Sequence, residues 1–419
     1  MKVVFPLVAV MAFAAWGSGE FERVWERRFV FDNEVELPAG TYLPAAHYSA
    51  EVETLPAAMQ FVEDGNMVLT FAAPTNVAPP FTMHLYLTGR HKPGVFVTKD
   101  GKTTLSRIES YAADFDPRRA DYAKRLRFVV TGGARNGKIQ LTAGIGQADT
   151  RFVTIGRQNR PYVKDGRLYF TFSARGYGST LGVMSFDPDR LDFRMEGTIL
   201  FDYGDGLLRN DVASDLFFDE ETKEWRAYVS NFSTGSDALG KRAAGGLNCA
   251  WSKTCPLHGV SIMKAKSLGL TGMNEDPDGY YDETVGRWRL LVSEFVPGSI
   301  RASMLESERW DGGFTRIAGP VEVDSTGTTI ALLRGELKCL WGSANRQLYI
   351  RSYPDLKPEG AFALKEPPWS PKTSMNGRVW PAYVRLANGT ELLLTFDRVN
   401  FDGMPKPNWT YGKLLLYRR

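Results

Sequence analysis

The 419-residue sequence contains little cysteine, little histidine and no excess of one charge. Its three cysteines are too few for a disulfide framework, and its four histidines show no metal-ligand spacing. Lysine and arginine number 51 against 48 acidic residues, so the net charge of +3 gives no reason to expect a nucleic acid or an anionic membrane as partner. Beyond the N-terminus no apolar run is long enough to span a bilayer. These absences argue against a metal-dependent, a nucleic-acid-binding or a membrane-embedded protein as the leading hypothesis.

The cysteines differ in their surroundings. Cys249 and Cys255 are close enough in sequence to close a small loop in an oxidising compartment. Cys339 lies in an apolar strand pattern, and we expect it to be a buried thiol. His258 is the only histidine near the first pair, so a zinc site would lack a fourth ligand.

The first nineteen residues have the features of an export signal. Lys2 supplies a positive charge, residues 3–16 form an apolar run, and residues 17–19 are small enough for cleavage. A buried first strand or helix is the alternative. We predict that the mature chain is soluble and is secreted or periplasmic.

Aromatic residues and glycine are abundant, at 12% of the chain and 41 residues respectively. Many aromatic residues in short strands separated by glycine are typical of an all-β fold. A hairpin signal recurs about every fifty residues: a short strand, a turn with Asp-Gly, Asn-Gly or a variant, and a second strand. Five copies and an upstream sixth candidate span residues 162–173, 217–230, 280–293, 332–341, 383–396 and 61–71.

A hairpin followed by returning strands, repeated at nearly constant spacing, is what one blade of a β-propeller requires. A β-sandwich with similar hairpins has no reason to keep one strand order. We predict an all-β protein with a signal peptide at residues 1–19, a β-rich N-terminal region at 20–150 and a propeller at 151–419. Five blades are predicted, and six or seven are the alternative if the N-terminal region supplies more.

In a propeller the innermost strands begin around one channel, so the residues before each hairpin meet in space. Acidic residues occur there: Asp211 and Asp215 in the second unit, and Glu275, Asp276 and Asp278 in the third. Glycosidic bond cleavage needs one protonated carboxyl for the leaving oxygen and one carboxylate on the anomeric side. We select Glu275 as the acid, whereas Asp276 and Asp278 are individually more typical of turn residues.

The segment Glu275-Asp276-Pro277-Asp278-Gly279-Tyr280-Tyr281 resembles the Glu-x-Pro strand start that carries the general acid in five-bladed glycosidases, notably the arabinanase/xylosidase and invertase families. The resemblance covers residues 155–419 at the level of the repeat. It implies that an aspartate of the preceding blade, Asp211 or Asp215, orients the sugar and tunes the acid. Those families also place a catalytic aspartate at the first blade's strand start, where this chain has Asn159-Arg160-Pro161. The base is therefore expected from Asp211, Asp215 or the N-terminal region.

Further side chains at the predicted channel mouth are candidates for carbohydrate binding. Arg160 and Arg175 could bind a carboxylate or sugar hydroxyls, with structural ion pairs as the alternative. Tryptophans could stack on a sugar, although packing is their default role. The predicted substrate-binding set is Asn159, Arg160, Arg175, Asp276, Trp251 and Trp380. No metal site is predicted, and although the channel of such a fold can hold a divalent ion, no residue here demands one.

Taken together, these patterns predict a secreted, monomeric glycoside hydrolase that acts on a polysaccharide or a derived oligosaccharide. Two other functions stay open, because fold does not imply function. One is a polysaccharide lyase or sialidase-like propeller with a His or Tyr base and an Arg for the substrate carboxylate. The other is a non-catalytic propeller that binds carbohydrate or protein.

Overall fold

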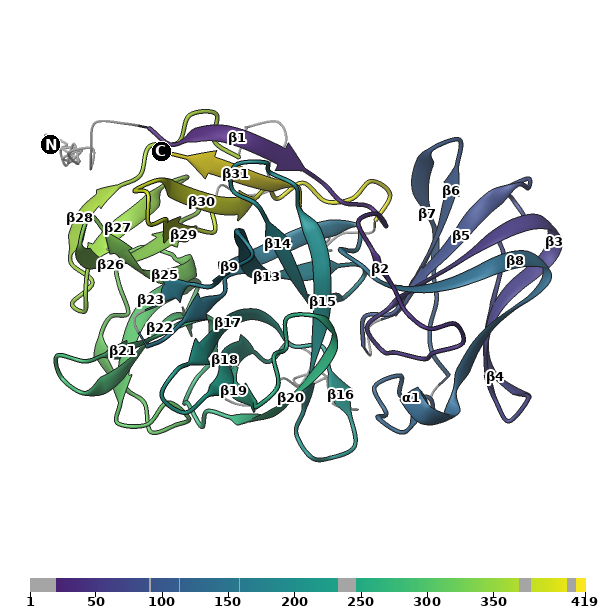
Figure 1. Cartoon of the computed structure of the whole chain (residues 1–419), viewed down its shortest axis with the longest axis horizontal. Coiled ribbons are helices and arrows are strands. Elements are labelled where there is room, and N and C mark those ends of the chain that lie inside the picture. Colours follow the sequence, from purple (N-terminus) through teal and green to yellow (C-terminus); the bar gives the residue numbers. More distant parts are fainter. Residues whose placement is uncertain are drawn as a thin grey trace, which may run out of the picture.

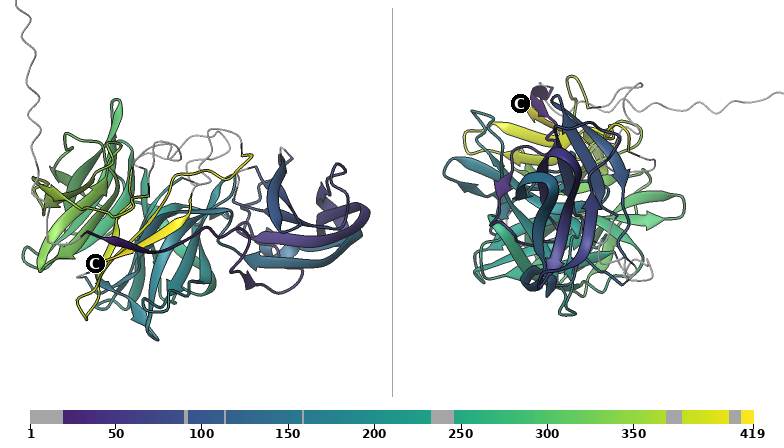
Figure 2. Two further views of the ribbon diagram at one scale, coloured as in Figure 1. Left: turned by 90° about the horizontal axis from the view of Figure 1, so that it is seen from above. Right: turned by 90° about the vertical axis from the view of Figure 1, so that its right-hand side faces the viewer.

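The computed structural model describes residues 20–89, 92–112, 114–157, 159–232, 246–368, 378–404 and 412–419. In this part of the chain nearly all regular structure is β-strand, and the one helix, α1 (Tyr122–Arg125), has four residues. A twisted N-terminal sheet lies beside a larger ring of sheets (Figure 1; Figure 2). No helix within the described ranges has the length and apolar character needed to cross a membrane. The predicted export signal, residues 1–19, lies outside the described residues.

The N-terminal sheet has the strand order β2-β8-β3-β5-β6-β7, with β4 paired to β3. Its β3-β4 and β6-β7 hairpins turn through Asp64-Gly65 and Asp100-Gly101, where all four residues have positive φ. This is the turn geometry that an Asp-Gly pair favours. The strands are β2 (Val35–Glu36), β3 (His47–Glu63), β4 (Asn66–Ala72), β5 (Phe81–Tyr86), β6 (Gly94–Lys99), β7 (Lys102–Ile108) and β8 (Arg127–Leu141).

The rest of the described chain forms five four-stranded antiparallel units. The first contains β9 (Gly146–Phe152), β13 (Arg167–Arg175), β14 (Ser179–Phe186) and β15 (Arg194–Asp202). The second contains β17 (Val212–Asp219), β18 (Glu224–Ser230), β19 (Leu247–Ser252) and β20 (Gly259–Ser267). The third contains β21 (Asn274–Asp282), β22 (Arg287–Val296), β23 (Ser299–Ser307) and β24 (Thr315–Ala318).

The fourth unit contains β25 (Thr326–Leu333), β26 (Glu336–Gly342), β27 (Leu348–Ser352) and β28 (Pro358–Ala361). The fifth contains β29 (Ala382–Arg385), β30 (Glu391–Phe396), β31 (Leu414–Arg418) and β1 (Glu22–Arg27). Short strands extend the first two units: β10 (Thr154–Ile155), β11 (Arg160–Pro161), β12 (Val163–Lys164) and β16 (Leu208–Arg209).

The five innermost strands contact one another in the order β9, β17, β21, β25 and β29, and β29 contacts β9 again. The units therefore close into a ring, which makes the predicted β-propeller correct as a fold. The ring is joined by strand β1, which pairs with β31, so the fifth unit combines the first and the last strand of the described residues.

This pairing corrects the predicted region boundaries. Residues 22–27 belong to the propeller although they precede the N-terminal sheet, and the first innermost strand begins at Gly146. The N-terminal sheet is therefore an insertion between the outermost strand of the last unit and the innermost strand of the first. It packs on the ring through a shared apolar cluster that includes Tyr48 and Phe61 on its side and Phe170 and Leu394 on the other.

The predicted hairpins lie where expected in the second to fifth units, as β17-β18, β21-β22, β25-β26 and β29-β30. The first unit differs. Residues 167–173 do lie in a strand, β13. On the channel side β13 pairs with β9, whereas the predicted partner, β12, pairs with only two residues at the beginning of β13. The sixth candidate, β3-β4, is a true hairpin that lies in the N-terminal sheet rather than in a blade.

The cysteines are all free. Cys339 is fully buried in β26, as predicted, whereas Cys249 is buried in β19 and Cys255 is exposed. The small disulfide loop that the spacing allowed is therefore not formed.

Candidate active site

Four of the five innermost strands share the same local irregularity. In β9, β17, β21 and β25 one extra residue interrupts the pairing with the next strand, which is a β-bulge. A residue at each bulge has positive φ: Asp149 at 52°, Ala213 at 55°, Asp276 at 55° and Gly327 at 66°. Because three of these are not glycine, the backbone holds a costly conformation at the same level in successive blades. The bulges mark one layer of the channel.

A cavity of about 460 Å³ opens on the side of this layer where the innermost strands begin. Asp149 of β9 lines it, together with Glu275 and Asp276 of β21. Aromatic side chains complete much of its wall, namely Tyr177, Phe232, Phe295 and Trp380. Carboxyl groups far apart in sequence therefore line one cavity, and the aspartates in it are Asp149 and Asp276 rather than Asp211 or Asp215.

Asp149 is a candidate site residue that sequence reasoning missed. Its Oδ2 accepts hydrogen bonds from Ser173 Oγ and from Arg175 Nη2, each at 2.5 Å. Both donors lie on β13, the strand paired with β9. The expected departure from the glycosidase pattern arose because Asn159-Arg160-Pro161 was assigned to the first blade's strand start. The innermost strand of the first unit is instead β9 (Gly146–Phe152), which has Asp149 at its bulge.

Asp276 links the third unit to the fourth through hydrogen bonds. Its Oδ2 accepts hydrogen bonds from Gly327 N at 2.9 Å, Thr326 Oγ1 at 3.0 Å and Ser293 Oγ at 3.3 Å. Burial raises the pKa of Asp276, and the nearby charge of Asp149 raises it further against the opposing hydrogen bonds. These bonds hold the bulge that presents Glu275, which is only half-buried, to the cavity.

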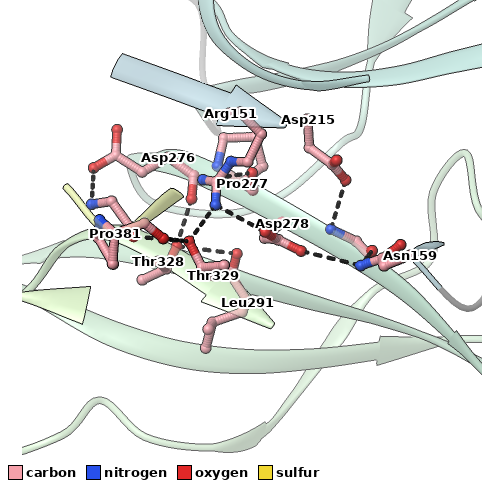
Figure 3. Close-up of polar contacts among 12 residues, drawn as sticks. Arg151, Asn159, Asp215, Asp276, Pro277, Asp278, Leu291, Thr328, Thr329 and Pro381 are labelled. Atoms are coloured by element: carbon pink, nitrogen blue, oxygen red, sulfur yellow. Dashed lines mark hydrogen bonds and ion pairs between the residues drawn. The ribbon is translucent and has the colours of Figure 1, made fainter. Parts of the chain in front are cut away.

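Below the bulge layer, the buried side chain of Arg151 lies among polar groups of neighbouring strands (Figure 3). Its Nη1 donates to Asp278 Oδ2 at 2.8 Å and to Thr329 Oγ1 at 2.5 Å, and its Nη2 donates to Pro277 O at 3.3 Å. Its guanidinium carbon lies 5.5 Å from the centroid of the Trp380 ring. One buried side chain of β9 thereby contacts β21, β25 and the segment that leads into β29.

Two buried aspartates belong to this layer. Asp215 Oδ2 accepts the backbone N–H of Gly279 at 2.8 Å. Burial raises the pKa of Asp215 to about 6, with Arg151 and the Gly279 N–H opposing the rise. Burial also raises the pKa of Asp278 well above its ordinary value, against the effect of Arg151. These contacts join β9, β17, β21 and β25 to one another, which is a structural role.

Several predicted site residues lie at the opposite opening of the channel. Asn159, Arg160 and Asp215 line that cavity, which has a volume of about 610 Å³. Asn159 Nδ2 donates to Gly279 O at 2.9 Å, and exposed Arg160 forms an ion pair with Glu220 at 2.5 Å. These side chains do not line the Glu275 cavity. Asn159 and Arg160 follow β9 in the chain, and Asp215 lies beyond the bulge of β17.

Of the remaining candidates, Arg175 and Trp380 do line the Glu275 cavity. Asp211 is buried and accepts a hydrogen bond from Tyr203 Oη at 2.7 Å. Ala213 occupies the bulge position of β17, which follows Asp211 and contains Asp215, so neither aspartate takes the place equivalent to Asp149. Trp251 of β19 packs edge-to-face on a neighbouring tryptophan and is not among the residues that line the cavity.

Histidines and metal ligands play no visible part in this cavity. His47 and His84 are buried in the N-terminal sheet, where His47 Nε2 lies 2.9 Å from His84 Nδ1. His258 pairs with Glu196 at the periphery, and His91 lies outside the described residues. In the described ranges, no group of three or more His, Cys, Asp or Glu side chains is arranged to hold a metal ion.

No family model and no curated protein matches the sequence. Similar solved structures include a GH62 α-L-arabinofuranosidase catalytic domain from Coprinopsis cinerea, 13% identical with a TM-score of 0.41, over 65% of this chain and 90% of that one. A Bombyx mori GH32 β-fructofuranosidase is 10% identical with a TM-score of 0.41, over 64% and 59% of the two chains. A Bacteroides ovatus GH43 enzyme is 11% identical with a TM-score of 0.39, over 64% and 51%. The solved structures to which this chain is similar are thus glycoside hydrolases, as the sequence resemblance implied, at low identity and low TM-score.

Proposed function

We propose that this chain is a glycoside hydrolase in which Glu275 is the general acid and Asp149 is the carboxylate on the anomeric side. The observation that carries the proposal is the convergence of Asp149 and Glu275, from the first and third innermost strands, in one cavity of about 460 Å³. Paired carboxyl groups around a sugar-sized pocket with aromatic walls are what glycosidic bond cleavage requires. The substrate class is a polysaccharide or a derived oligosaccharide.

The reaction follows from the two roles. Glu275 donates its proton to the glycosidic oxygen as the bond from that oxygen to the anomeric carbon breaks. Asp149 either takes a proton from the attacking water or bonds to the anomeric carbon before water replaces it. Arg175 and Ser173 hold the Asp149 carboxylate through Oδ2, which fixes the orientation of the group that must act on the anomeric side.

The test is hydrolysis of a panel of aryl glycosides and polysaccharides by the wild type and by Glu275→Gln. Removal of a general acid is expected to lower kcat/KM by about 10²- to 10⁴-fold. The matched control is Glu220→Gln, because Glu220 pairs with Arg160 and does not line the Glu275 cavity; its activity should stay near that of the wild type. Thermal unfolding of each variant verifies folding. If folded Glu275→Gln cleaves every substrate as fast as the wild type, the acid assignment is wrong.

A second reaction has a specific observation in its favour. Tyr177 and Arg175 line the same cavity. For elimination, Tyr177 would supply the base and Arg175 would bind the substrate carboxylate. A lyase product is unsaturated and absorbs in the ultraviolet, whereas a hydrolase product does not. Elimination would require Tyr177 and be lost in Tyr177→Phe, while hydrolysis would require Glu275.

We also propose that the protein acts outside the cytoplasm, in agreement with a polymeric substrate. The basis is the charged, then apolar, then small-residue pattern of residues 1–19. Mass spectrometry of the exported protein is expected to show a mature N-terminus close to residue 20. A product that retains Met1 would contradict this.

A further inference from the structure

Three arginines line the cavity that contains Glu275: Arg175, Arg378 and Arg398. Arg175 ends β13 of the first unit, while Arg378 and Arg398 flank β29 and β30 of the fifth. The first and fifth units are neighbours in the ring, because β29 contacts β9. The arginines therefore form one arc of the wall. Glu275 belongs to the third unit, which borders neither of these units.

The positions of the guanidinium groups are set by contacts within the protein. Arg175 Nη2 lies 2.5 Å from Asp149 Oδ2, and Arg378 Nε lies 2.8 Å from Asp324 Oδ2. Arg398 Nε donates to the backbone oxygen of Arg378 at 3.1 Å, and Arg398 is only 7% exposed. Anchored groups of this kind are preorganised and lose little freedom when a ligand binds.

The chemistry of the arc restricts its ligand. A guanidinium only donates hydrogen bonds, whereas a sugar hydroxyl both donates and accepts. Carboxylate and sulfate oxygens only accept, and they match the planar donor fork and its charge. On this arc the three guanidinium groups outnumber the one carboxylate that also lines the cavity there, Asp149, so the arc suits an anionic substituent better than a neutral sugar face.

We infer that the sugar held in this cavity carries an acidic group, a carboxylate or a sulfate, which binds the arc of Arg175, Arg378 and Arg398. This inference rests on the proposed function and specifies its substrate as an acidic glycan. Glu275 stands on the wall away from the arc, so one sugar ring presents its glycosidic oxygen to the acid and its charged substituent to the arginines. The sugar that carries the acidic group is thus the sugar whose glycosidic bond is cleaved.

The test uses substrates matched in sugar and anomer that differ only at C6: the neutral aryl glycoside, its uronide and its 6-sulfate. We expect one acidic member to be cleaved with kcat/KM at least tenfold above the neutral member, and the preferred member identifies carboxylate or sulfate. Arg398→Gln should reduce kcat/KM for that acidic member at least tenfold more than for the neutral one. Arg385→Gln is the matched control, because Arg385 lies in the same unit but is exposed at the opposite opening.

Binding separates this inference from the proposed function. Calorimetry with Glu275→Gln and uncleaved oligosaccharides of uronic acids, sulfated sugars and neutral sugars measures recognition without catalysis. Acidic oligosaccharides that bind at least tenfold more tightly than neutral ones, in a way that Arg398→Gln abolishes, support the inference even if no substrate is cleaved. Cleavage or binding that favours neutral sugars, or equal losses in the Arg398 and Arg385 variants, overturns it and leaves the hydrolase proposal standing. If nothing is bound and nothing is cleaved, both fail.

Discussion

The two openings of the propeller channel are lined by the same innermost strands and differ in what their charged groups do. The opening beyond the bulges is the larger, at about 610 Å³ against 460 Å³, and it includes two buried aspartates. There Asp278 is paired with Arg151, and Asp215 accepts a backbone N–H. On the other side Glu275 is half-buried at the cavity wall. Each opening therefore contains two buried aspartates, and the proposed site lies at the smaller opening, where Asp149 shares the cavity with the half-buried Glu275.

The largest expected effect separates the two openings by activity. Asp149→Asn removes the carboxylate on the anomeric side and should lower kcat/KM by about 10²- to 10⁴-fold, since the amide cannot act as a base or nucleophile. Asp215→Asn makes the same chemical change beyond the bulge and should leave kcat/KM within about threefold of the wild type. Steady-state kinetics on the best substrate of the panel measures both. Equal losses in the two variants would remove the distinction between the openings.

The second effect is on stability. Arg151→Met removes the guanidinium and leaves Asp278 buried without its partner, which should cost about 3–5 kcal/mol in the free energy of unfolding. Arg160→Met, at the rim, breaks only an exposed ion pair and should cost about 0–1 kcal/mol. Urea denaturation measures both values. Adding Asp278→Asn to Arg151→Met should recover part of the loss, and an unchanged double variant would contradict the buried-charge explanation.

The third effect is the pH dependence of stability. The pKa of Asp215 is about 6 in the folded protein and near its ordinary value in the unfolded chain. Between these values the folded state holds a proton that the unfolded state has released, so this group lowers stability as pH rises. Asp215→Asn removes the contribution, and its stability relative to the wild type should rise between pH 4 and 6 by at most about 3 kcal/mol. Urea denaturation at several pH values measures the difference, and a pH-independent difference would refute it.

The smallest effect concerns the bulge layer that divides the openings. Ala213 has φ of 55°, a conformation that glycine adopts without cost. Ala213→Gly should therefore be at least about 1 kcal/mol less destabilising than Ala227→Gly, which removes an equally buried methyl group from the neighbouring strand β18. Denaturant unfolding of both variants measures the difference. Equal losses would mean that the positive φ at Ala213 carries no strain.

Much of the fold was predictable because its signals are local. Turns such as Asp165-Gly166 and Arg334-Gly335 have positive φ at both residues, and the strands around them alternate or are continuously apolar. The position of Glu275 near the beginning of a strand was predictable for the same reason, since the hairpin of β21 (Asn274–Asp282) and β22 has a local signal. Asp149 was not, because β9 has no turn signal of its own. Its pairing with β13 spans the intervening segments β10, β11 and β12.

By itself, the sequence determined that the chain is built from repeated hairpins and that Glu275 stands where one of them begins. Turn chemistry and side-chain alternation act over a few residues, so they can be read along the chain. Only the tertiary structure decided that β1 completes the last unit, that β9 is an innermost strand and that Asp149 shares a cavity with Glu275. Those facts depend on pairings between residues far apart in sequence, where closure of the ring, rather than local preference, selects the partner.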